Sequence, residues 1–244
     1  MRATPSRRYR TVARSQRLFR SFLAEQTDPE RFYTDVANDT IALITRHEPL
    51  EGRTVLDVGA GQEQFGPRFV DNGARYVAVD LERASLNPSA GNGAVVGRGE
   101  HLPFPDATFD IVMSNNVMEH VTDPDVLCDE MVRVVRPGGL IFISYTVWAS
   151  PWGGHETSPW HLLGGHYARR RYERKHGRAP KNRFGESMHA ATVAGGLRWA
   201  KRQKDADLLE AAPRYHPSWA DPVLRVPGLR EVVSWNLLLV LRRC

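Results

Sequence analysis

Short apolar runs and amphipathic segments alternate along most of this chain. Residues 53–58 form the first run, which is rich in aliphatic and β-branched side chains and favours a short buried strand. A helical pattern of apolar positions begins near residue 65. Strands that alternate with helices indicate an α/β protein built on a mainly parallel sheet. The other strands are predicted at residues 76–79, 94–96, 109–113, 140–145, 206–213 and 237–242, and further helices at 124–135 and 192–201.

The first predicted strand runs directly into a glycine-rich turn, Gly59-Ala60-Gly61. Glycine allows backbone angles that a side chain would forbid, and it lets the backbone approach a ligand closely. Asp80 ends the second predicted strand, about 20 residues beyond the turn, where a carboxylate can bind both hydroxyls of a ribose. The strand, the turn and the acid together predict a nucleotide-type cofactor at this edge of the sheet.

Further motifs follow the turn in a fixed order. Jointly they resemble those of the class I S-adenosylmethionine-dependent methyltransferases, in the small-molecule branch, and the chain as a whole resembles actinobacterial members of that branch. The resemblance covers roughly residues 50–150. The motifs are the Asp-Val-Gly-Ala-Gly turn at residues 57–61, the Val-Asp pair at 79–80, and the segments 99–110, 116–121 and 133–139.

The resemblance implies a doubly wound, Rossmann-like sheet of seven strands with helices on both faces. Its last strand would run antiparallel between strands five and six, and an insertion after strand five would act as a lid. The implied cofactor is S-adenosylmethionine. The residues expected to bind it are Asp57, Gly59, Ala60, Gly61, Asp80, Leu81, Gly99, Glu100, Asn115 and Asn116.

The chain departs from the family pattern at two positions. Glu63 replaces the third glycine of the turn, and Arg98 replaces an acid that precedes the position of Glu100. Arginine cannot accept a hydrogen bond from the adenine amino group. We expect main-chain groups to hold the ligand there, because two glycines and Asp80 remain; the alternatives are weak binding and a non-catalytic cofactor-binding protein.

The N-terminal 48 residues are expected to form a helical cap on a methyltransferase domain at residues 49–244. Asp28, Pro29 and Glu30 are typical of a helix start, with a capping carboxylate, a proline in the first turn and a favourable acid. Arginine is frequent through residue 20. We interpret that segment as a solvated tail leading into a packed helix, in preference to an amphipathic helix on anionic lipid.

Residues 146–190 should form the lid that binds the methyl acceptor, because connections of this length are usually functional. His155 follows two glycines and is our first candidate for the base that deprotonates a hydroxyl, with His120 the second. We expect no metal: His155, Glu156 and His161 lack the His-Glu-x-x-His spacing of a zinc site. An oxygen-rich Mg²⁺ site that includes Glu156 stays open, since such sites leave little trace in a sequence.

Composition narrows the acceptor and the compartment. Two cysteines in 244 residues rule out a disulfide framework and fit a reducing cytoplasm, and no apolar run is long enough to span a membrane. The net charge of +5 and a basic helix at residues 167–177 suit an anionic acceptor, although arginine-rich composition alone gives the same charge. We expect O-methylation of a small molecule, sugar or glycolipid, with peripheral membrane contact at most; an RNA methyltransferase ranks second, and the sequence indicates no oligomeric state.

Overall fold

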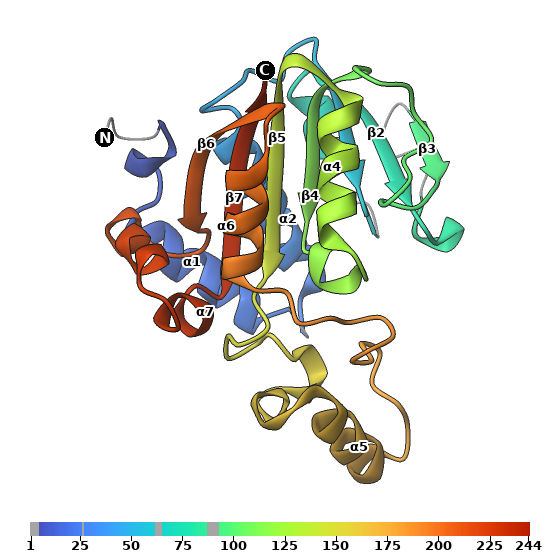
Figure 1. Cartoon of the computed structure of the whole chain (residues 1–244), viewed down its shortest axis with the longest axis vertical. Coiled ribbons are helices and arrows are strands. Elements are labelled where there is room, and N and C mark those ends of the chain that lie inside the picture. The colour runs from blue at the N-terminus through green and yellow to red at the C-terminus, as the bar shows by residue number, and fades with distance from the viewer. Residues whose placement is uncertain (1–4, 26, 62–64, 87–92) are drawn as a thin grey trace.

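A computed structural model describes residues 5–25, 27–61, 65–86 and 93–244. The chain folds around one seven-stranded sheet with the order β3-β2-β1-β4-β5-β7-β6 (Figure 1). The strands from β3 to β5 run parallel, whereas β7 is antiparallel to both β5 and β6. This confirms the predicted fold, including the place of the last strand. The strands are β1 (Thr54–Val58), β2 (Arg75–Asp80), β3 (Gly93–Val96), β4 (Phe109–Asn115), β5 (Val135–Thr146), β6 (Ala206–Pro213) and β7 (Asn236–Arg243).

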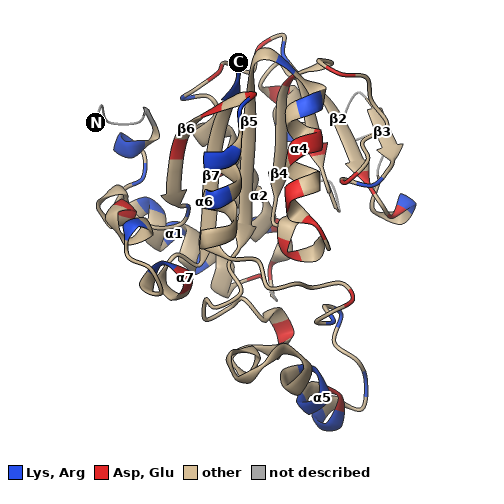
Figure 2. Cartoon of the chain, in the orientation of Figure 1, with Lys and Arg blue, Asp and Glu red and all other residues tan. Residues whose placement is uncertain are grey.

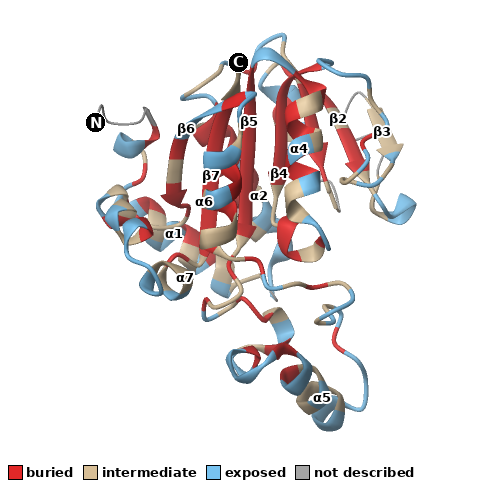
Figure 3. Ribbon diagram, in the orientation of Figure 1, coloured by how far each residue is buried: buried red, intermediate tan, exposed pale blue. Residues whose placement is uncertain are grey.

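Helices cover both faces of the sheet, and the central strands between them are buried (Figure 3). Helices α4 (Pro124–Val134) and α6 (Val193–Arg202) pack on one face, and α2 (Pro29–Ile44) and α3 (Gly66–Asp71) pack on the other. The remaining helices are α1 (Val12–Leu23), α5 (Gly165–His176) and α7 (Leu229–Val233), with short 3-10 helices η1 (Pro5–Arg8), η2 (Arg83–Ser85), η4 (Met118–His120), η5 (His155–Thr157), η6 (Trp160–Leu163) and η7 (Ser218–Arg225).

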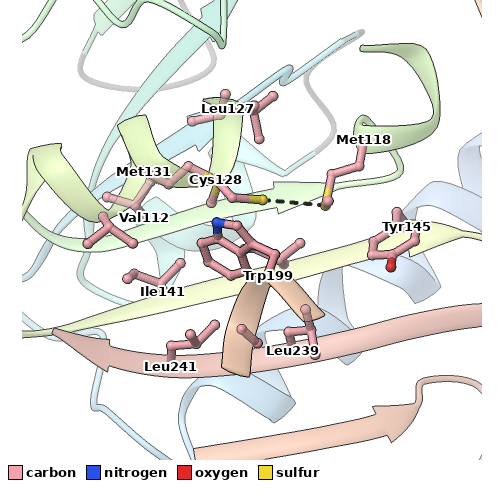
Figure 4. Close-up of a cluster of buried hydrophobic side chains, with 14 of the residues drawn as sticks. Val112, Met118, Leu127, Cys128, Met131, Ile141, Tyr145, Trp199, Leu239 and Leu241 are labelled. Atoms are coloured by element: carbon pink, nitrogen blue, oxygen red, sulfur yellow. Dashed lines mark hydrogen bonds between the residues drawn. The ribbon is translucent and has the colours of Figure 1, made fainter. Parts of the chain in front are cut away.

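The core under α4 and α6 is organised around Trp199, which is fully buried (Figure 4). Its indole Nε1 donates a hydrogen bond to the Asp129 carboxylate at 2.8 Å, so the polar edge of the ring is satisfied. Cys128 lies in the same core, where burial raises the pKa of its thiol well above the ordinary value. This cysteine is therefore a packing residue, and the inert thiol agrees with the absence of a disulfide framework.

Local signals place the helix ends where the sequence predicts them. The Asp28 carboxylate accepts a hydrogen bond from the Arg31 backbone N–H at 3.2 Å and so caps α2. The Thr192 hydroxyl caps α6 in the same way. One boundary differs from the prediction: residues 135–139 belong to β5. Val135 pairs with Phe109 and Leu140 pairs with Ile111, so the intervening residues bulge out of a continuous strand instead of forming a separate turn.

The N-terminal segment packs as a helix, and two of its arginines, Arg10 and Arg14, are not solvated as the prediction of a solvated tail expects. Arg10 and Arg14 are buried, and each guanidinium makes a two-point ion pair with a carboxylate. Arg10 contacts Asp221 through two hydrogen bonds of 2.7 Å, and Arg14 contacts Asp39 at 2.6 and 2.8 Å. Sequence periodicity cannot separate a paired, buried arginine from a solvated one, because both are equally polar positions.

The insertion, residues 146–190, extends beyond the carboxyl edge of the parallel strands, at the bottom of Figure 1. Trp152 packs the insertion against the N-terminal segment, since its ring centroid lies 5.3 Å from that of Phe22. The same ring lies 4.6 Å, between centroids, from Trp235, directly before β7. Within the described part of the chain, no helix combines the length and the apolar character that a membrane crossing requires.

Candidate cofactor and acceptor site

The glycine turn after β1 has the backbone that the sequence requires. Gly59 and Gly61 take φ values of +74° and +59°, which side chains rarely adopt. A Cβ at Gly59 would lie 2.5 Å from a methyl carbon of Val117, so there is no space for a side chain. Ala60 lies between them, half-buried. The turn therefore exposes backbone beside the ends of β1 and β4, where the cofactor is expected.

Asp80 is tied to that turn at the end of β2. Its Oδ2 accepts a hydrogen bond from the Gly61 N–H at 3.0 Å, and its Oδ1 accepts one from the Glu82 N–H at 2.9 Å. A carboxylate oxygen can accept more than one hydrogen bond, so both oxygens keep capacity for a ligand hydroxyl. The neighbouring Leu81 is largely exposed. The carboxylate is thus oriented in advance for the ribose contact that the sequence predicts.

Asp57 occupies a different environment within β1. It is buried, and its Oδ2 accepts a hydrogen bond from the Tyr76 hydroxyl at 2.5 Å. Gly99 and Glu100, which the resemblance assigns to the adenine, follow β3 and are half-buried. A Cβ at Gly99 would lie 2.6 Å from a methyl carbon of Leu127, which explains the glycine by packing. Of the two departures from the family pattern, Arg98 is exposed, and Glu63 lies outside the described residues.

Asn115 and Asn116 end β4, where the methionine end of the cofactor is expected. The Asn115 Oδ1 accepts hydrogen bonds from the Arg214 guanidinium at 2.7 Å and from the Ser144 hydroxyl at 3.1 Å. Its Nδ2 is buried and has no hydrogen-bond partner among the residues that the structure describes. Asn116 has φ +55° and accepts a hydrogen bond from Asn236 at 2.7 Å. Both amides are therefore oriented, and the Asn115 Nδ2 is a free donor at this edge.

Arg214 is a site residue that sequence reasoning missed. It is fully buried behind Asn115, and it also donates to the Thr40 hydroxyl at 2.6 Å. Asp39, the partner of Arg14, lies 3.8 Å from the same guanidinium. A single arginine after a strand forms no sequence pattern. Its role in orienting Asn115 is visible only from its partners on α2, β4 and β5.

The structure brings together His155 and His120, the two candidates for the base. Their ring centroids lie 5.4 Å apart, although His120 ends η4 and His155 begins η5 in the insertion. His155 takes φ +48°, and its Nε2 is buried without a hydrogen-bond partner in the described part of the chain. Burial lowers the pKa of His155; the Glu119 carboxylate opposes this, and the imidazole of His120 adds to it. The lowered pKa favours the neutral imidazole, the form that can accept a proton.

Glu119 completes this cluster and was also missed. It is 2% exposed, and its Oε1 accepts a hydrogen bond from the Thr146 N–H at 3.0 Å. Its Oε2 is buried with no partner among the described residues. One ligand-type atom from each of Glu119, His120 and His155 lies within 4.8 Å of the other two. In the sequence, Glu119 lies in the motif at residues 116–121 and directly precedes His120, but neither fact assigns it a role.

The other candidates for metal or base chemistry lie elsewhere. Glu156 is exposed and accepts hydrogen bonds from the Asn182 side chain at 3.2 and 3.3 Å. His161 is buried with its Nε2 3.0 Å from the Ser150 carbonyl oxygen. Neither joins the cluster of Glu119, His120 and His155, so the Mg²⁺ site that includes Glu156 gains no support.

Comparison with known proteins agrees with this geometry. A family model described as a methyltransferase domain matches residues 56–143. The chain is 46% identical to an uncharacterized methyltransferase of Mycolicibacterium gilvum, over 95% of each chain. It is also 46% identical, over 95% of each chain, to an uncharacterized methyltransferase of Mycobacterium tuberculosis strain H37Ra.

Solved structures show the same fold. An S-adenosylmethionine-dependent methyltransferase of Mesorhizobium loti matches with a TM-score of 0.56 and 20% identity, over 80% of this chain and 93% of that one. A TehB-like methyltransferase of Corynebacterium glutamicum matches with a TM-score of 0.55 and 17% identity, over 84% and 88%. The chain belongs to the methyltransferase family of these relatives, and its fold is that of S-adenosylmethionine-dependent methyltransferases. Within them it is similar over nearly its whole length to the actinobacterial enzymes above, so it is an enzyme and not a non-catalytic binding protein.

The residues at the carboxyl edge fit S-adenosylmethionine. Gly59 leaves room only for backbone, Asp80 keeps acceptor capacity, and the buried Asn115 Nδ2 has no partner among the described residues. When bound, this cofactor supplies a methyl group that its sulfonium has already activated for displacement. The protein's own task is to hold the acceptor in line, exclude water and manage a proton.

Proposed function

We propose that this enzyme methylates a hydroxyl oxygen of a small molecule, a sugar or a glycolipid. The observation that carries the proposal is the meeting of His155, His120 and Glu119 at the edge of the sheet where β4 ends. A hydroxyl group must lose its proton during methylation, and a neutral imidazole is suited to accept it. His155 is the first candidate, because its Nε2 is buried and has no hydrogen-bond partner among the residues that the structure describes.

The cofactor contacts are part of the same proposal. The Asp80 carboxylate would accept hydrogen bonds from the ribose, and the loop of Gly99 and Glu100 would lie along the adenine. Asn115 would donate its free Nδ2 to the methionine end, which Arg214 supports by holding the Oδ1. The other contributors would be Asp57, Gly59, Ala60, Gly61, Leu81 and Asn116.

The insertion is proposed to bind the acceptor. Its outer end exposes the apolar side chains of Leu162 and Leu163, together with Trp160 and Tyr167. Helix α5 beside them is strongly basic, as Figure 2 shows, and the Arg171 guanidinium lies 3.9 Å from the Trp160 ring centroid. Apolar side chains beside cations suit a lipid-linked, anionic acceptor at the cytoplasmic face of a membrane.

A methyl-transfer assay with labelled S-adenosylmethionine tests the proposal against cell extract separated into small-molecule, lipid and RNA fractions. We expect labelled product from the first two fractions. Label that appears only in RNA would favour the nucleic-acid alternative, which the basic α5 also permits.

Substitution then tests the base. His155→Ala should lower kcat by roughly 10²–10⁴ while the affinity for S-adenosylmethionine, measured by calorimetry, stays the same. His176→Ala is the matched control, because this histidine is exposed at the end of α5. Full turnover in both His155→Ala and His120→Ala would remove the cluster from the chemistry.

A further inference from the structure

We propose that Glu119, His120 and His155 bind a divalent transition-metal ion. The residues come from η4 and from the start of η5, so a metal would connect the sheet edge to the insertion. The ion-binding site stands on the geometry alone; its use in catalysis rests on the function proposed above.

Spacing is the first support. One ligand atom from each residue lies within 4.8 Å of the other two. Three ligand atoms bound to one tetrahedral ion at about 2.0–2.2 Å lie about 3.3–3.6 Å apart, so the three side chains must move together by about 1 Å to complete the site.

Unused lone pairs are the second support. The Glu119 Oε2 and the His155 Nε2 are both buried, and neither has a partner in the described part of the chain. If these two groups formed an ordinary ion pair, the two atoms would be bonded to each other. Two residues of one cluster thus each carry a buried polar atom that a shared ligand would satisfy.

The surrounding contacts are the third support. His120 Nδ1 lies 2.7 Å from the Ser187 carbonyl oxygen, so it carries the proton and leaves the Nε2 lone pair free. Metal-ligating histidines usually donate their other ring N–H to such a group. The Glu119 Oε1 is held by the Thr146 N–H at 3.0 Å, which orients the Oε2. His120 and Glu119 are thus each oriented by a hydrogen bond to the backbone, as metal ligands commonly are.

The donor set narrows the ion. Two imidazole nitrogens and one carboxylate oxygen suit Zn²⁺, Fe²⁺, Mn²⁺ or Co²⁺, whereas Mg²⁺ and Ca²⁺ prefer oxygen ligands. Three protein ligands leave a coordination position open. The sequence expectation of no metal failed to find this set because its members lie on two separate segments, without a local spacing motif.

An open position would let the acceptor hydroxyl bind the ion directly. The positive charge would lower the pKa of the hydroxyl, and the proton would leave to water. The oxygen lone pair would then form the new C–O bond as the C–S bond of the sulfonium breaks, and the electron pair of that bond would stay on sulfur as a neutral thioether. The His155 lone pair would serve the metal in this case, so the ion replaces His155 as the means of deprotonation.

The test is metal binding by the full-length protein after chelator treatment, with Co²⁺ as a spectroscopic probe and Zn²⁺ in calorimetry. We expect one equivalent of Co²⁺ to give visible absorption bands, and Zn²⁺ to raise the melting temperature. Glu119→Gln and His120→Ala should each weaken binding at least tenfold, and His176→Ala should leave it unchanged. Circular dichroism and S-adenosylmethionine calorimetry show whether each variant folds.

Two results would overturn the inference. One is the absence of stoichiometric Co²⁺ binding to the wild-type protein, which needs no variant to interpret. The other is undiminished binding in the double variant His120→Ala/His155→Ala. Loss of kcat in His155→Ala without any metal binding would overturn the inference and keep the proposed function. Metal binding that depends on these residues, in a protein that methylates no hydroxyl, would support the site and remove the function.

Discussion

Arg14→Met should lower the free energy of unfolding, because it leaves the buried carboxylate of Asp39 without its main partner. Arg14 is 4% exposed; its Nε and Nη2 contact the Asp39 carboxylate at 2.6 and 2.8 Å, and its Nη1 donates to the Arg214 carbonyl at 3.0 Å. Removing one partner of a buried ion pair typically costs about 3–5 kcal/mol, because the other charge stays buried. Asp39 keeps the Tyr9 hydroxyl at 3.1 Å and the Arg214 guanidinium at 3.8 Å, so we expect the lower end, about 3 kcal/mol.

Urea denaturation followed by circular dichroism measures this free energy of unfolding. Arg17→Met is the matched control: Arg17 lies on the same helix but is exposed, so its loss should change stability by no more than about 0.5 kcal/mol. The double variant Arg14→Met/Asp39→Asn should lose less than the two single variants summed, because the two residues interact directly. Equal stability of Arg14→Met and Arg17→Met would refute the reasoning, since the Asp39 charge would then tolerate burial without Arg14.

Three further outcomes are expected. Asp80→Ala should raise the dissociation constant of S-adenosylmethionine by about 10²–10⁴, because two charge-assisted hydrogen bonds of about 1.5–3 kcal/mol each are lost. Unchanged affinity in calorimetry would show that Asp80 does not bind the ribose. Burial would raise the pKa of Glu210, but hydrogen bonds from His47 and Ser6 and the charge of Arg10 outweigh it and lower that pKa below 4.5. The ionised Glu210 therefore stabilises the fold above about pH 5, and this stabilisation is lost as the pH falls through the lowered pKa. The difference in unfolding free energy between wild type and Glu210→Gln should shrink in acid. A difference that is constant with pH would contradict this. Replacing Arg170 and Arg174 with glutamate should raise the KM for an anionic acceptor and leave cofactor affinity unchanged. Lys204→Glu, an exposed position outside the insertion, should change neither. Equal kinetics of the wild type and both variants would leave α5 without a role in acceptor binding.

The fold follows from the sequence wherever local chemistry determines the backbone. β6 coincides with the predicted residues 206–213, and Gly59 and Gly61 adopt the positive φ values that their position in the turn requires. The boundary at β5 was misplaced because Pro137 and the following glycines are typical of a turn, yet here they occupy a bulge whose partner strand continues past it.

The parts of the site that the sequence did not reveal depend on contacts between distant segments. Arg214 reaches Asn115 across the sheet edge, and Glu119 meets His155 only after the insertion folds back. Buried ion pairs have the same property: Arg10 and Arg14 resemble Arg17 along the chain, and only the positions of Asp221 and Asp39 distinguish them. A single polar residue carries no periodicity, so its role becomes visible only with its partner.

The packing of Trp152 against Phe22 and Trp235 has a consequence for how this enzyme can change over evolution or by design. The insertion does not rest on the sheet alone, because one of its aromatic side chains is held by α1 and another contact comes from the segment before β7. Exchanging the insertion for that of a relative would leave an apolar surface on α1 uncovered. If the insertion binds the acceptor as proposed, a change of acceptor should require the N-terminal helix, the insertion and Trp235 to vary together. Chimaeras that exchange only residues 146–190 should fold poorly.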